Sequence, residues 1–96
     1  MNISQRVINE IIKFARKYNV NEVILFGSRA RGDNIERSDI DIAVSGGDFD
    51  SFYWDIKENF HSLLMFDIIN LDDTLSQDLL CEIQKDGVKL YEHEKI

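Results

Sequence analysis

The stretch Ser38-Asp39-Ile40-Asp41-Ile42-Ala43-Val44 decides the fold expected for this chain. Its apolar and acidic side chains alternate, which is typical of a β-strand with one face against a core and one face open. Asp39 and Asp41 would then project from the open face and repel each other, and a divalent cation such as Mg²⁺ relieves that repulsion. The same alternation also fits an ordinary solvent-facing strand, so the aspartate pair alone leaves both interpretations open.

A segment bounded by two glycines precedes this strand. The apolar residues 23–26 predict a short buried strand, and Gly27-Ser28-Arg29-Ala30-Arg31-Gly32 follows it directly. Gly27 lets the backbone approach a ligand closely, and Ser28 offers a hydroxyl and an N–H at the start of a helical turn. Arg29 and Arg31 carry charge within reach of phosphate oxygens. The segment predicts a phosphate site, although glycine and serine after a strand also form common turns and caps.

A third acidic residue follows one helix later, in Phe66-Asp67-Ile68-Ile69. A carboxylate inside so apolar a strand needs a partner, because burying an unpaired charge is costly. If this strand lies beside the one that carries Asp39 and Asp41, three carboxylates share one face and can hold two metal ions. Asp72 and Asp73 are rivals for the third position, but their place before a helix predicts capping instead.

Hydrophobic spacing predicts the elements around these motifs. We expect a first helix, opened by Asn2 with Gln5 in a capping box, to run to about Tyr18. A second helix covers about 49–64, a third strand 65–70, and a third helix, capped by 72–74, ends at Gly87 as its C′ residue; 88–91 form a last strand. The expected fold class is α/β (α+β), a small mixed sheet of three to four strands flanked by helices, in one domain over residues 1–96.

The composition narrows the classes of function. The chain has 96 residues, 44% of them hydrophobic and 30% charged, as in ordinary globular proteins. A formal net charge of −7 argues against a sequence-independent nucleic-acid binder, which needs a basic face. No membrane span or signal peptide is recognisable. Cys81 is the single cysteine and cannot form an internal disulfide, which favours a reducing, cytoplasmic location.

Together the motifs resemble the nucleotidyltransferase superfamily that includes DNA polymerase β and the kanamycin-type aminoglycoside nucleotidyltransferases. Its pattern is Gly-Ser, about ten residues, Asp-x-Asp, and a third acidic residue on a later strand. Here ten residues, 29–38, separate Ser28 from Asp39, and Asp67 follows after one expected helix. Residues 27–32 and 38–44 are especially similar to the minimal nucleotidyltransferases of bacteria and archaea, and the resemblance covers nearly the whole chain.

The resemblance implies metal-dependent chemistry at the three aspartates. Asp39 and Asp41 are expected to ligate two Mg²⁺ ions, with Mn²⁺ as the alternative metal. Asp67 is expected to ligate the catalytic ion and to act as, or assist, the general base.

The resemblance also implies how a nucleotide binds. Gly27 and Ser28 are expected to hold the β- and γ-phosphates of ATP, and Arg29 and Arg31 to neutralise phosphate charge. The implied reaction transfers a nucleoside monophosphate, AMP from ATP, to a hydroxyl group.

Minimal members of this family are commonly paired with a separate, all-helical HEPN-type protein, which is a toxin that the nucleotidyltransferase counteracts as antitoxin. Some attach AMP to a tyrosine of that toxin. The resemblance therefore implies a HEPN-type partner that is also the acceptor, in a hetero- or homo-oligomer. Two alternatives stay open: an antitoxin that masks its partner without catalysis, or an enzyme with a small-molecule acceptor. Base preference and the number of transfers are not set by the sequence.

Four further residues receive structural predictions. Cys81 stands near leucines of the third helix and is expected to fill space in the core. His61 and His93 are isolated and are expected at the surface. Of the adjoining aromatic residues on the second helix, Trp54 is the best candidate for an exposed partner-binding surface, although partial burial is the commoner fate of tryptophan.

Overall fold

A computed structural model describes residues 1–35, 37–60 and 64–93 of the chain. In chain order, its elements are α1 (Gln5–Lys17), β1 (Glu22–Phe26), α2 (Ser28–Arg31), β2 (Ile40–Ser45), α3 (Phe49–Asn59), β3 (Phe66–Asn70), α4 (Gln77–Asp86) and β4 (Val88–Glu92).

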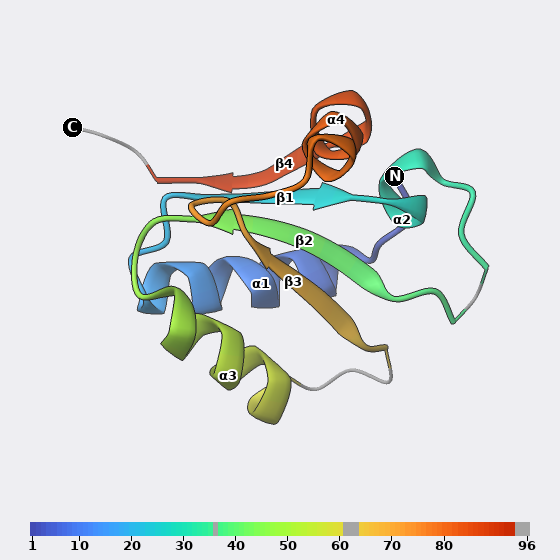
Figure 1. The fold of residues 1–96 in the computed structure, drawn as a ribbon. Helices are drawn as coiled ribbons and strands as arrows, with labels where there is room; N and C mark the ends of the chain where they lie inside the picture. Colours follow the sequence, from blue (N-terminus) through green and yellow to red (C-terminus); the bar gives the residue numbers. More distant parts are fainter. Residues whose placement is uncertain (36, 61–63, 94–96) are drawn as a thin grey trace.

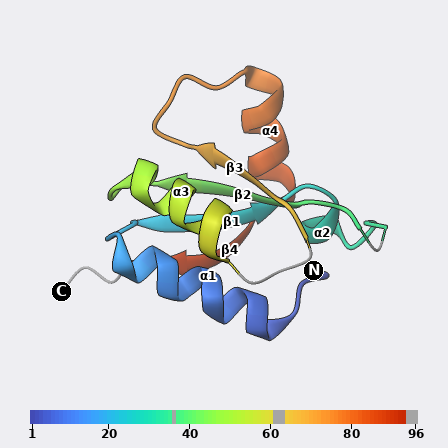
Figure 2. The ribbon, with the colours of Figure 1, turned by 90° about the horizontal axis from the view of Figure 1, so that it is seen from below.

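The four strands form one mixed sheet in the order β3-β2-β1-β4 (Figure 1). Strand β1 is antiparallel to both β2 and β4, whereas β2 and β3 are parallel. Helices α1 and α3 cover one face of the sheet and α4 lies on the other, as Figure 1 and the view from below in Figure 2 show. The predicted mixed sheet flanked by helices is confirmed.

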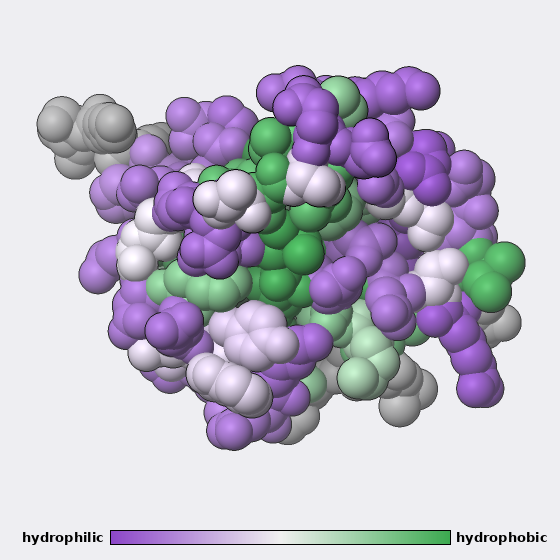
Figure 3. All heavy atoms as spheres, in the orientation of Figure 1, coloured by the Kyte–Doolittle hydropathy of each residue, from purple (hydrophilic) through white to green (hydrophobic). Residues whose placement is uncertain are grey.

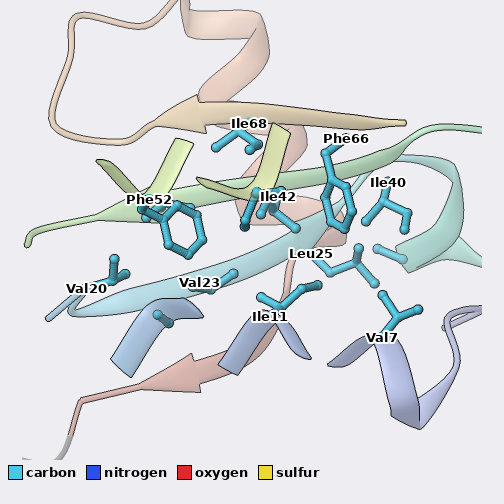
Figure 4. Packing of buried hydrophobic residues seen from close by; sticks show 14 residues of the cluster. Val7, Ile11, Val20, Val23, Leu25, Ile40, Ile42, Phe52, Phe66 and Ile68 are labelled. Carbon is cyan, nitrogen blue, oxygen red and sulfur yellow. The ribbon is translucent and has the colours of Figure 1, made fainter. Parts of the chain in front are cut away.

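The larger core cluster lies between the sheet and the pair α1 and α3. Every second residue of the strands points into it, so that Leu25, Ile42 and Ile68 meet Ile11 of α1 and Phe52 of α3 (Figure 4). A smaller cluster on the other face joins Phe26 and Ala43 to Ile83 of α4; its half-buried members are Ile24, Ile69, Leu71, Leu75 and Leu79. The period of two along each strand therefore separates two layers of side chains.

The first helix begins later than the sequence predicted. Ser4, and not Asn2, is its N-cap, because the Ser4 hydroxyl accepts a hydrogen bond from the Val7 N–H at 3.3 Å. Gln5 does not reach back to close a capping box; its side-chain amide donates to Asn9 at 2.9 Å. Serine and asparagine cap almost equally well, so local preference could not separate the two positions.

The second and third predicted helices also differ at their ends. Helix α3 stops at Asn59, since Phe60 has extended backbone, and the predicted positions His61 and Leu63 lie outside the described residues. Helix α4 is capped by Ser76, whose hydroxyl accepts from the Leu79 N–H, so the predicted capping by residues 72–74 is wrong.

Asp72 has a different task from the one predicted. Its carboxylate accepts a hydrogen bond from the Gly46 N–H at 2.8 Å, which ties the segment after β3 to the turn after β2. Gly87 stands at the C-cap of α4 with extended backbone and not at C′. There a Cβ would overlap the Ile83 carbonyl oxygen.

Cys81 is exposed on α4, so its predicted place in the core is wrong. Trp54 is 60% exposed, so partial burial, the commoner fate of tryptophan, is not what the fold gives it; His93 is exposed as predicted. In the part of the chain that the structure describes, no helix has the length and apolar character needed to cross a membrane.

A polar network joins the two helices that cover the larger core. The Asp55 carboxylate on α3 accepts hydrogen bonds from the Tyr18 hydroxyl, from Lys17 Nζ at 2.9 Å and from the Asn59 amide at 2.6 Å. Chiefly the bond from Tyr18, and then those from Lys17 and Asn59, lower the pKa of Asp55 to about 2. The folded state therefore prefers the ionised carboxylate.

This network predicts how stability depends on acid. An Asp with a lowered folded pKa stabilises the fold above its unfolded pKa, about 3.9, and loses that contribution as the pH falls through the folded value. Asp55→Asn should therefore lower the melting temperature at pH 6, with a loss that shrinks between pH 4 and 2 in thermal unfolding followed by circular dichroism. Glu58→Gln, an exposed change on the same helix, is the control. An Asp55→Asn deficit that stays constant down to pH 2 would contradict the network's role.

Candidate active site

The two faces of β2 carry opposite chemistry. Ile40, Ile42 and Val44 are buried against α1 and α3, whereas Asp41 and Ala43 alternate with them and face the side of α4. Strand β3 repeats this pattern: Phe66 and Ile68 enter the larger core, while Asp67 points to the other side and is exposed. The predicted arrangement of both acidic strands, with their carboxylates on one face, is thus present in the fold.

The sheet register brings the predicted residues into one row. Phe26, Asp41 and Asp67 are direct partners across β1, β2 and β3. Adjacent strands lie about 4.8 Å apart, so Asp41 and Asp67 are immediate neighbours on their shared face. Gly27 follows Phe26 at the end of β1, and Asp39 immediately precedes β2 and is exposed. The prediction that the two acidic strands adjoin is confirmed.

Gly27 allows the Asp41 side chain to occupy its position. The backbone of Gly27 has φ 75°, in the left-handed region that glycine adopts without strain. A Cβ at this position would overlap Oδ2 of Asp41. The carboxylate therefore packs directly on the glycine backbone, and a larger residue there would displace it.

Asp41 is held where ionisation is unfavourable. Burial is the largest cause, and the negative charges of Asp67, Asp39 and Glu82 add to it, so the pKa of Asp41 rises to about 6. The positive charge of Arg31 opposes this shift. A group in this environment accepts either a proton or a cation readily.

The donor set fits a hard divalent cation, but the side chains are not gathered around one point. Within residues 1–35, 37–60 and 64–93, no three His, Cys, Asp or Glu side chains are close enough together to hold a metal ion as they stand. Asp39 and Asp67 are both exposed, however, and so have room to turn toward Asp41. Carboxylate oxygens are the ligands that Mg²⁺ prefers. The backbone placement and the donor chemistry therefore fit such an ion.

The two arginines of the Gly27–Gly32 segment have separate environments. Arg29 is only 6% exposed; its Nε donates to the Ser38 carbonyl at 2.9 Å and its Nη1 to the Asn2 carbonyl at 3.1 Å. It therefore fastens the N-terminal segment and the start of β2 to α2. Here Nε and Nη1 are used on backbone oxygens, and the phosphate role of Arg29 stays a prediction.

Arg31 is half-exposed and bound to carboxylates. Its Nε lies 3.1 Å from Asp33, and its Nη1 lies 3.2 Å from Asp86 and 3.7 Å from Glu82. Sequence reasoning missed both residues of α4. Glu82 and Asp86 stand four residues apart on one helix face, which is a recognisable signal, but only the tertiary fold shows that this face meets Arg31.

Comparison with known families identifies the chain. A family model described as Polymerase beta, Nucleotidyltransferase matches residues 9–96. The chain belongs to this nucleotidyltransferase family. No curated protein matches it.

Several solved structures are also similar to this nucleotidyltransferase. A toxin–antitoxin structure with AMP-PNP is 28% identical with a TM-score of 0.71, over 91% of this chain and 74% of the other. A tri-AMPylated Shewanella oneidensis HEPN toxin in complex with MNT antitoxin gives 26% identity and a TM-score of 0.67, over 95% and 74%. A candidate nucleotidyltransferase from Sulfolobus solfataricus gives 26% identity and a TM-score of 0.58, over 94% and 81%.

The strained ionisation of Asp41 predicts a gain in stability when its charge is removed. An Asp with a raised folded pKa costs the fold nothing below its unfolded pKa, and the full penalty is present above the folded value, here about 6. Asp41→Asn should therefore stabilise the metal-free nucleotidyltransferase at pH 8 by about 1 kcal/mol, a value discounted for solvent screening. The gain should vanish near pH 3.5. Urea unfolding in EDTA at both pH values measures it, and equal stability of both proteins at pH 8 would contradict the cause assigned to the shift.

The contact between Gly27 and Asp41 predicts different outcomes for two similar substitutions. Gly27→Ala and Gly32→Ala both place a Cβ on a backbone with positive φ, 75° and 85°, and each should destabilise the fold by about 1 kcal/mol or more. Only the Gly27 change meets Asp41, since a Cβ on Gly32 has nothing nearer than the Met1 nitrogen at 4.0 Å. Carboxyl-carbon NMR titration should show the Asp41 pKa moving toward its ordinary value in Gly27→Ala alone. The same pKa in both variants would contradict the contact.

Proposed function

We propose that this chain is a metal-dependent nucleotidyltransferase that transfers AMP from ATP to a hydroxyl of a partner protein, a tyrosine of a HEPN-type toxin, and so acts as its antitoxin. The observation that carries the proposal is that Asp41 and Asp67 are partners on adjacent strands, with Gly27 packed against Asp41 and Asp39 directly before β2. Family membership and the similar toxin–antitoxin structures support it.

The three aspartates are assigned to metal and proton chemistry. Asp39 and Asp41 would ligate two Mg²⁺ or Mn²⁺ ions, and Asp67 would ligate one of them. Bound divalent ions supply positive charge that stabilises the attacking and leaving oxygens of a phosphoryl displacement. Asp67 is exposed at the outer strand, where it can also take the proton of an incoming hydroxyl.

The phosphates are assigned to the end of β1. Gly27 and Ser28 would contact the β- and γ-phosphates, because the glycine lets the backbone come close to the ligand. Arg31 would meet the triphosphate as a counter-charge. Arg29 would act through its hold on the Asn2 and Ser38 carbonyls, keeping α2 and the start of β2 together.

The proposed reaction is a single displacement of pyrophosphate at the α-phosphorus. The acceptor oxygen forms a bond to the α-phosphorus while the bond from that phosphorus to the bridging α–β oxygen breaks. Pyrophosphate leaves toward Gly27 and Ser28, and the proton of the acceptor hydroxyl passes to Asp67. The product is a phosphodiester between AMP and the acceptor.

The position of β3 favours a large acceptor. Displacement at phosphorus is in line, so the acceptor enters opposite the pyrophosphate and hence on the side of β3. Strand β3 is the edge of the sheet, with no further strand beside it in the described chain. Met65, directly before it, is 66% exposed. Figure 3 shows apolar side chains reaching the surface between α4 and the strands below it, a surface that suits contact with a protein.

Loss of single carboxylates tests the proposal. Asp39→Asn, Asp41→Asn and Asp67→Asn should each reduce the transfer of label from α-³²P-ATP, with Mg²⁺, to a co-expressed HEPN-type partner by more than about 100-fold. Asp73→Asn, an exposed change near β3, should leave transfer unchanged. Label that still reaches the partner in all three variants would refute catalysis at this site.

The same variants separate catalysis from masking. If the chain silences its partner by AMP transfer, Asp39→Asn should fail to protect cells that express the partner. Protection that survives in the Asp39→Asn and Asp41→Asn variants would favour inhibition by binding alone. Transfer to N-acetyl-tyrosinamide but to no protein would favour a small-molecule acceptor.

A further inference from the structure

Arg31 is the meeting point of three carboxylates. The carboxylate of Asp33, two residues further along the chain, lies 3.1 Å from Nε. The carboxylates of Asp86 and Glu82 on α4 lie 3.2 Å and 3.7 Å from Nη1. The side chains of Arg31 and Glu82 are 38% and 43% exposed, and that of Asp86 is 18% exposed. One guanidinium therefore bridges α2 and α4 at a site that water and an incoming anion can reach.

This bridge lies beside the proposed nucleotide site. The Arg31 N–H donates to the Gly27 carbonyl at 3.1 Å, so the arginine is anchored to the glycine that packs on Asp41. Glu82 and Arg31 both lie close enough to Asp41 to act on its charge. Helix α4 is fixed over this end of β1 by Ile83, which packs against Phe26. The carboxylates of α4 and a bound triphosphate would thus face the same guanidinium.

We infer that Glu82 and Asp86 set the nucleotide affinity of this chain by competing with the triphosphate for Arg31. The inference rests on the proposed function, since it requires a nucleotide at Gly27 and Ser28. Nη1 leaves the two carboxylates of α4 when the triphosphate binds, while Asp33 keeps Nε and the orientation of the guanidinium. Affinity is then reduced by the fraction of Arg31 that α4 retains.

Nucleotide binding and the contact between Arg31 and α4 affect each other reciprocally. If α4 lowers nucleotide affinity by holding Arg31, the nucleotide must loosen the hold of Arg31 on α4 by the same factor. The C-terminal half of α4, which contains Glu82 and Asp86 and leads into β4, should then open more often when the site is filled. Nucleotide occupancy would be transmitted through α4 to β4, at the edge of the sheet opposite β3.

The test measures binding of AMP-PNP with Mg²⁺ to the full chain by isothermal titration calorimetry. The double variant Glu82→Gln/Asp86→Asn should bind about 3- to 10-fold more tightly than the natural chain, the range expected for releasing two exposed ion pairs. Asp78→Asn removes one charge from an exposed position of the same helix and should leave the affinity unchanged. Glu82→Gln alone should give a smaller gain, and it keeps the Asp86 pair in place if the double variant unfolds.

A double-mutant cycle separates competition from a general change of charge. In an Arg31→Gln background the two α4 substitutions should bring little or no gain, because the contested group is absent. A general field effect would instead give an equal or larger gain in that background. Hydrogen exchange of the last turn of α4 should also rise on addition of Mg²⁺ and AMP-PNP in the natural chain but not in Arg31→Gln.

These measurements distinguish failure of the nucleotide site from failure of the competition for Arg31. If the natural chain does not bind AMP-PNP with Mg²⁺, the proposed function itself fails. If it binds, and Glu82→Gln/Asp86→Asn binds no more tightly or gains equally with and without Arg31, the competition is refuted while the nucleotide site stands.

Discussion

The position of β2 between β1 and β3 is the constraint on which both the core and the candidate site depend. Its isoleucines and valine enter the larger core, where Ile40, Ile42 and Val44 have no exposed surface. Because successive residues of a strand point to opposite faces, the same burial fixes Asp41 on the other side. A shift of one residue in register would send the aspartate into the core. The energy of apolar packing therefore holds the carboxylate in place.

The position of Asp41 lowers the stability of the fold but suits the proposed function. Asp41 sits against Gly27, among other negative charges, where its ionised form costs the fold free energy and its pKa rises to about 6. Binding of a cation or a proton by the carboxylate removes this free-energy cost. Groups whose protonation is unfavourable in this way cluster at functional sites. The glycine is part of the same arrangement, because any side chain at position 27 would displace the carboxylate.

The sequence was sufficient for the strands and the aspartates because both depend on a short period. Alternation along 39–44 predicted the two faces of β2, and the order of motifs placed Asp67 on a later strand that proved to be its neighbour. Helix ends were less predictable, since Ser4 and Asn2, or Ser76 and Asp72, have similar capping preferences. The different environments of Arg29 and Arg31 depend on contacts with distant segments. No local pattern shows that Ser38 and Asn2 carbonyls bind the first arginine, or that Glu82 and Asp86 bind the second.

In the proposed function, Asp39, Asp41 and Asp67 act as one metal and nucleotide site. A crystal structure of this chain with Mn²⁺ and AMP-PNP tests it most directly, because manganese gives an anomalous signal of its own. We expect manganese within about 2.2 Å of carboxylate oxygens from all three aspartates, with the β- and γ-phosphates against Gly27 and Ser28. Manganese bound away from Asp41, or a nucleotide that lies apart from Gly27, would contradict it.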